Sequence, residues 1–79
     1  MKAKVYVTLK NGVLDPQGKA VMGALKSMSF GEVSDVRIGK FMELELNAPS
    51  KEAGQARVKE MCEKLLANTV IENYRIEME

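Results

Sequence analysis

Apolar and polar residues alternate along the segment from Val36 to Leu46. Every second residue from Val36 onward is apolar, and Lys40 is the single interruption. A period of two is typical of a strand that buries one face. Because the alternation keeps its phase across Gly39 and Lys40, it favours one long strand, with or without a bend, over a two-residue hairpin that would move the apolar residues to the opposite face. A three-residue loop over residues 39–41 also keeps the phase and remains open.

The length of this strand predicts a partner. A strand from about Val33 to Asn47 would be roughly 45–50 Å long at about 3.3 Å per residue. A compact chain of 79 residues is only about 30 Å across. The strand would extend beyond its own domain, and its far half would need cover from another chain. We therefore expect an obligate oligomer, a dimer or a tetramer, with three apolar side chains at the oligomer interface: Met42, Leu44 and Leu46.

Two other segments have helical spacing. Asp15 and Pro16 suit the N-cap and the first turn of a helix that begins there. Ser50 suits the N-cap of a second helix. The apolar positions of the first helix recur at helical spacing and predict one buried face, made of Ala20, Val21, Ala24, Leu25 and Met28.

Strands flank these helices. Residues 2–10 and residues 70–79 alternate between apolar and polar positions, which predicts a first and a last strand. The order is therefore β-α-β-α-β, or β-α-β-β-α-β if the middle strand is broken. Both orders predict an α+β fold, a two-layer sandwich with the helices on one face of the sheet, and the broken version is ferredoxin-like.

Composition narrows the class of protein. At 79 residues, with 46% hydrophobic and 29% charged residues, the chain is one small globular domain over residues 1–79. A net charge of +1 gives no basic excess for a nucleic acid backbone. No apolar run approaches the roughly 20 residues that span a bilayer, and the first residues do not form a signal peptide. With a single Cys, we expect a cytoplasmic protein without nucleic acid or membrane partners.

The chain has few residues that could act in catalysis. The chain has no His, and no set of residues has the spacing of a zinc site. Cys62 lies on the apolar stripe of the second helix, which is typical of a small core residue rather than a reactive thiol. Glu43 and Glu45 share one strand face and could pair as acid and base, but such a row is more often a solvated face. We expect no catalytic, cofactor-binding or metal-binding residue in this chain.

Four segments in order carry a family resemblance. They are KVYVTLK at residues 4–10, VLDPQG at 13–18, VRIGKFMEL at 36–44 and MCEKLLANTVIENY at 61–74. Together they closely resemble the PurS family, the small subunit of phosphoribosylformylglycinamidine synthase in purine biosynthesis. The resemblance covers essentially the whole chain.

The resemblance implies a function without catalysis. The enzyme converts formylglycinamide ribonucleotide (FGAR) to the amidine (FGAM) and consumes ATP and glutamine, with Mg. A large synthetase subunit performs the ligation and a separate glutaminase subunit releases ammonia. The PurS-like chain is a non-catalytic dimer that bridges these two subunits and supports ammonia transfer. The alternative is a small ligand-binding regulatory domain of ferredoxin-like type, which would bind a metabolite when alone.

Candidate partner contacts fall in the segments that carry the resemblance. Each has a structural alternative: capping for Asp15 and Asn68, a bend for Gly39, and packing for Phe41 and Tyr74. The candidates are Asp15, Pro16 and Gln17 at the start of the first helix, Arg37, Gly39, Lys40 and Phe41 in the middle strand, and Asn68, Thr69 and Tyr74 before and in the last strand.

Overall fold

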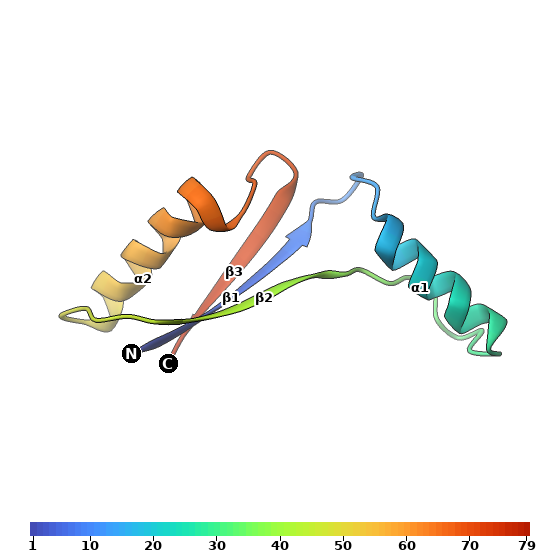
Figure 1. The fold of residues 1–79 in the computed structure, drawn as a ribbon, viewed down its shortest axis with the longest axis horizontal. Coiled ribbons are helices and arrows are strands. Elements are labelled where there is room, and N and C mark those ends of the chain that lie inside the picture. The colour runs from blue at the N-terminus through green and yellow to red at the C-terminus, as the bar shows by residue number, and fades with distance from the viewer.

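The computed structural model describes residues 1–79 and contains three strands and two α-helices (Figure 1). The order β-α-β-α-β is confirmed. The elements are β1 (Lys2–Leu9), α1 (Pro16–Ser27), β2 (Gly39–Glu45), α2 (Lys51–Met61), which continues as a π-helical turn (Cys62–Leu66), and β3 (Glu72–Met78).

The sheet has the strand order β2-β1-β3, and both neighbours run antiparallel to β1. Thr8 pairs with Gly39, Val7 with Lys40 and Tyr6 with Phe41. Residues 39–41 are therefore the first residues of an unbroken strand and form no loop. The α+β class is confirmed.

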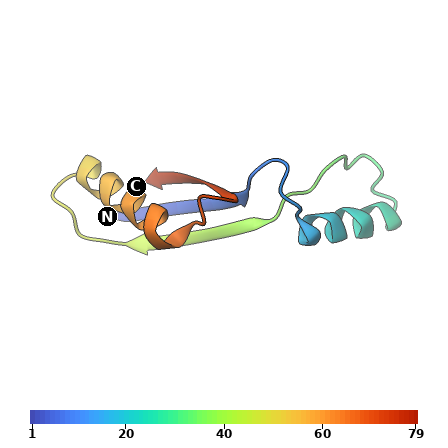
Figure 2. The same ribbon diagram turned by 90° about the horizontal axis from the view of Figure 1, so that it is seen from above.

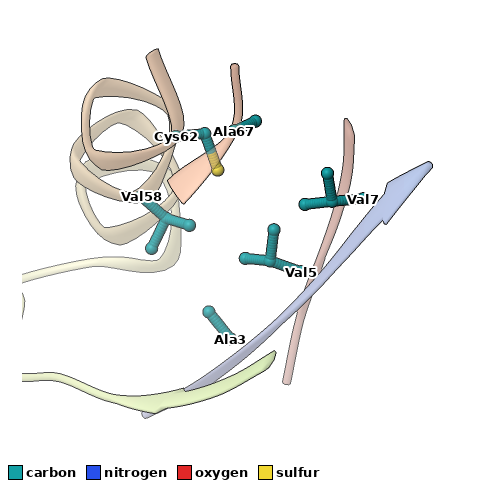
Figure 3. Close-up of a cluster of buried hydrophobic side chains, with 6 residues drawn as sticks. All are labelled: Ala3, Val5, Val7, Val58, Cys62 and Ala67. Carbon is teal, nitrogen blue, oxygen red and sulfur yellow. The ribbon is translucent and has the colours of Figure 1, made fainter. Parts of the chain in front are cut away.

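The core lies between the sheet and α2 (Figure 3). Ala3, Val5 and Val7 alternate along β1 and point toward α2, because successive strand residues face opposite sides. Val58 and Cys62 meet them from the helix, so Cys62 is a core residue as expected. Half-buried residues of β2 and β3, together with Leu46 directly after β2, complete the core: Met42, Leu44, Leu46, Tyr74, Ile76 and Met78.

The first helix is placed differently from the expectation. We predicted both helices on one face of the sheet, but only α2 covers it, while α1 projects beyond the end of the strands (Figures 1 and 2). The segment after α1 runs back beside this helix instead of along the sheet. The molecule is therefore long and thin, with extents of 51 × 24 × 14 Å. We call α1 together with residues 28–35 the arm.

The middle strand is also shorter than predicted. It begins at Gly39 and ends at Glu45, whereas the alternation suggested a strand from Val33 to Asn47. The reason lies in β1, which is eight residues long and whose ladder with the middle strand covers only Gly39–Glu45. Residues 33–38 extend past the end of β1 and have no neighbouring strand in this chain.

Candidate functional site

Five of the ten predicted partner contacts meet at the junction between the sheet and the arm. A cavity of about 380 Å³ opens there between the end of β1, the start of α1 and the start of β2. Its wall includes Asp15, Pro16, Gln17, Gly39 and Lys40. Segments that are more than twenty residues apart in the sequence therefore form one surface. Whether this surface contacts a partner subunit stays a prediction.

Glu72 connects the candidate contact Asn68 to this junction through its carboxylate. Its Oε2 lies 3.8 Å from Nζ of Lys40, and its Oε1 accepts a 2.7 Å hydrogen bond from the backbone N–H of Asn68. Sequence reasoning did not select Glu72. Its position depends on the register of β3, which pairs Glu72 with Leu9, and no local motif encodes that register.

Asp15 has both of its carboxylate oxygens occupied within the chain. Oδ1 accepts a 2.9 Å hydrogen bond from the N–H of Gly18, which confirms Asp15 as the N-cap of α1. Oδ2 accepts a 3.0 Å hydrogen bond from the N–H of Ile38. The side chain is buried and Arg37 Nε lies 3.9 Å from Oδ2.

These contacts lower the pKa of Asp15. The hydrogen bond from Gly18 makes the largest contribution, followed by the one from Ile38, because both favour the charged carboxylate. A lowered pKa in the folded state means that Asp15 stabilises the fold above its unfolded pKa, near 4. This stabilisation is lost as the pH falls through the lower folded value.

Gly39 lies at the start of β2, close against the backbone of β1. A Cβ at this position would lie 2.1 Å from the carbonyl oxygen of Val7 and 2.9 Å from Cγ2 of Thr8. Its φ is not positive, so the reason for glycine is space rather than a bend. The sequence suggested a bend at Gly39, and the structure replaces it with close contact between backbones.

Tyr74 is placed by a contact from the π-helical turn. Its hydroxyl donates a 2.5 Å hydrogen bond to Oε2 of Glu63, and its ring packs against the core on the α2 side. The acceptance by Glu63 favours the neutral phenol and raises the pKa of Tyr74 to about 12. The packing alternative for Tyr74 is thus supported.

This contact gives a titration prediction. In a Tyr6→Phe variant, Tyr74 is the only remaining phenol, and its absorbance should titrate with a midpoint near pH 12. Adding Glu63→Gln should move the midpoint toward the ordinary value of about 10. Because the folded pKa is raised, the stabilising contribution is complete below about pH 10 and is lost as the pH rises through 12. Equal midpoints in the two variants would contradict the contact.

The sheet face opposite α2 is polar with an aromatic centre. The rings of Tyr6 and Phe41 lie 5.0 Å apart between centroids, and the Arg75 guanidinium lies 4.1 Å from the Tyr6 ring centroid. Lys2 and Glu43 form a 3.0 Å ion pair on the same face. Phe41 thus packs against Tyr6, yet half of it remains exposed, at 51%.

The apolar face predicted for α1 is not buried by this chain. Gly18 is the only buried residue of the helix. Val21 is 39% exposed and Met28, which caps the helix, is 66% exposed. Leu14, just before the helix, is 69% exposed. The pattern correctly indicated an amphipathic helix, but its apolar face lacks an intrachain cover because the arm projects away from the sheet.

The residues predicted for the oligomer interface have cover within the chain. Met42, Leu44 and Leu46 are half-buried and pack against the core under α2. The prediction assumed that their face had no intrachain cover, whereas all three side chains pack partly against the core of this chain. Any further contact of these residues with a second copy stays a prediction.

The structure shows neither a metal-binding cluster nor a membrane-spanning helix. No group of three or more His, Cys, Asp or Glu side chains is arranged to hold a metal ion. Neither helix is long and apolar enough to cross a bilayer.

Comparison with known proteins identifies the family. Residues 2–79 match the PurS family model, described as phosphoribosylformylglycinamidine (FGAM) synthase. The chain belongs to the PurS family. The curated FGAM synthase subunit PurS of Bacillus subtilis is 63% identical over 78 residues, which cover 99% of this chain and 92% of that protein. The resemblance seen in the four segments is confirmed.

Solved PurS structures share the fold. The Bacillus subtilis PurS structure has a TM-score of 0.86 at 64% identity and covers 99% of this chain and 96% of that one. A chain of the PurLQS structure from Thermotoga maritima has a TM-score of 0.90 at 33% identity, with 99% and 95% covered. Membership of the PurS family favours the subunit hypothesis over a ligand-binding regulatory domain.

Proposed function

We propose that this PurS-family chain is the small, non-catalytic subunit of FGAM synthase and bridges the large synthetase subunit and the glutaminase subunit. The match to the PurS family over residues 2–79 carries the proposal. The likeness to a chain of the PurLQS structure supports a role within an assembly. The uncovered arm adds physical support, because a helix with an exposed apolar face is stabilised by a partner.

The chemistry in this proposal belongs to the partners. ATP, Mg and glutamine are used by the synthetase and glutaminase subunits, and the chain binds none of them alone. The chain holds the two subunits at a fixed separation so that ammonia released by one reaches the other. The reaction converts FGAR to FGAM in the cytoplasm. Residues 1–79 act as a single domain.

The chain itself associates as a dimer in this proposal. The arm presents Val21 and Met28, which the rest of the chain leaves exposed. Residues 33–38 precede β2 and have no neighbouring strand in this chain. An apolar helix face that the chain leaves exposed suits a second copy, which can cover it.

A kinetic comparison tests the proposed function. FGAM formation is measured with glutamine and, separately, with ammonium chloride as the nitrogen donor, using the synthetase and glutaminase subunits from the same source. Omitting this chain should abolish the glutamine-dependent rate and leave the ammonia-dependent rate. A glutamine-dependent rate that is unchanged without this chain would overturn the proposal.

A further inference from the structure

The chain crosses between the sheet and the arm twice (Figure 1). Residues 10–15 lead from β1 to α1, and residues 36–38 return to β2. No backbone hydrogen bond joins the two crossings. The direction of the arm is therefore not set by the sheet ladder, and side chains must hold the crossings together.

Two side chains make these connections. Asp15 Oδ2 accepts from the N–H of Ile38 at 3.0 Å, so the start of the helix holds the returning segment. Arg37 reaches the other way and donates from Nη2 to the carbonyl oxygens of Leu9 and Lys10, the latter at 3.2 Å. Asp15 and Arg37 also lie 3.9 Å apart between Oδ2 and Nε. Together, these four polar contacts tie the returning segment to the end of β1 and to the start of α1.

Packing around these contacts is close on one side and open elsewhere. A Cβ on Gly18 would lie 2.4 Å from the carbonyl oxygen of Val36, so the helix start contacts the returning backbone directly. Cavities of about 370 and 380 Å³ flank Asp15, and the first also borders Arg37. Apolar packing therefore does not fill the space between sheet and arm. The polar contacts of Asp15 and Arg37 therefore hold the angle between the arm and the sheet.

We propose that Asp15 and Arg37 form a latch that fixes the direction of the arm relative to the sheet and so positions the apolar face of α1 for assembly. Both are positioning residues that act through the backbone groups they hold. The positioning of α1 for assembly rests on the proposed self-association. The fixed direction of the arm does not depend on self-association, and it can be measured separately.

Asp15→Asn separates the latch from helix capping. Asparagine is as good an N-cap as aspartate, so the hydrogen bond from Gly18 is retained. Its amide nitrogen then faces the N–H of Ile38, which loses its acceptor. Arg37→Gln removes the other half of the latch.

Two variants serve as matched controls. Asp35→Asn removes the same charge close to the returning crossing, where Asp35 accepts only from the N–H of its neighbour Val36. Ser50→Ala removes the N-cap of α2, which accepts from Ala53, at a site remote from the junction.

Residual dipolar couplings of backbone N–H groups report the direction of the arm. In the wild type, Asp35→Asn and Ser50→Ala, couplings from α1 and from the three strands should fit one alignment tensor. In Asp15→Asn and Arg37→Gln the α1 couplings should shrink and no longer fit the tensor of the sheet. Self-association of both latch variants should weaken roughly tenfold or more, as for loss of a hydrogen bond to a charged group.

The dipolar couplings and the self-association together distinguish a failure of the latch from a failure of the proposed dimer. If α1 in Asp15→Asn fits the tensor of the sheet with wild-type magnitude, the latch is overturned. If the wild-type chain is monomeric while the α1 couplings respond as expected, the latch stands and the proposed self-association fails.

Discussion

The double substitution Val21→Asp/Met28→Asp is expected to abolish self-association of the chain. Both side chains lie on the uncovered face of the arm, with exposed fractions of 39% and 66%. A carboxylate buried without a partner in an apolar interface is strongly unfavourable. We therefore expect the dissociation constant of the dimer to rise roughly a hundredfold or more. Sedimentation equilibrium over a range of concentrations measures the change.

The control for this experiment is on the same helix. Lys19→Gln/Lys26→Gln changes the net charge by the same amount, and both lysines are exposed. This variant should keep the self-association of the parent. The core under α2 is remote from both pairs of sites, so circular dichroism should show the sheet intact in each variant. A double aspartate variant with the parent's mass would exclude the arm as the interface.

Gly39→Ala is expected to destabilise the fold by about 2–3 kcal/mol. The added methyl group would lie 2.1 Å from the carbonyl oxygen of Val7, and backbone atoms at this distance cannot move aside cheaply. Either the first pair of the β1–β2 ladder opens or β2 shifts outward. Urea unfolding at one fixed protein concentration measures the loss, because an oligomer changes its apparent stability with concentration.

Gly23→Ala is the matched control. A Cβ on Gly23 would meet nothing within 4 Å, and Gly23 lies in the interior of α1, roughly opposite Val21 on the helix. Alanine should therefore stabilise the helix by about 0.5–1 kcal/mol. If the two alanine variants shift the urea midpoint equally, close contact at Gly39 is not the reason for its glycine.

Local features of the fold were predictable from the sequence. The alternation in residues 2–10 and 70–79 indicated strands because side-chain direction is set by the backbone of each strand alone. Asp15 and Ser50 were recognisable as N-caps because a cap needs only the next three residues. The burial of Cys62 followed from its helical spacing.

Features that depend on distant segments were not predictable. An amphipathic pattern indicates that one face of α1 is apolar, but it does not indicate what covers that face. The sequence therefore led us to expect α1 on the sheet. The bounds of β2 depend on where β1 ends, which the alternation in β2 does not encode. The alternation already begins at Val36, although this chain offers residues 36–38 no neighbouring strand.

The candidate site shows the same division. The cap formed by Asp15 was predictable, but its hydrogen bond from Ile38 connects residues 23 positions apart. Glu72 was missed because its contacts with Lys40 and Asn68 depend on the register of β3. The junction could be suspected from its residue types, but its geometry required the fold.

The mass of the reconstituted assembly tests the bridging role most directly. The synthetase and glutaminase subunits from the same source are mixed with ATP, magnesium and glutamine, with and without this chain, and examined by multi-angle light scattering. Our account predicts one species containing all three proteins, and its loss when this chain is omitted. A synthetase–glutaminase complex of undiminished amount without this chain, or no association of this chain with either subunit, would contradict it.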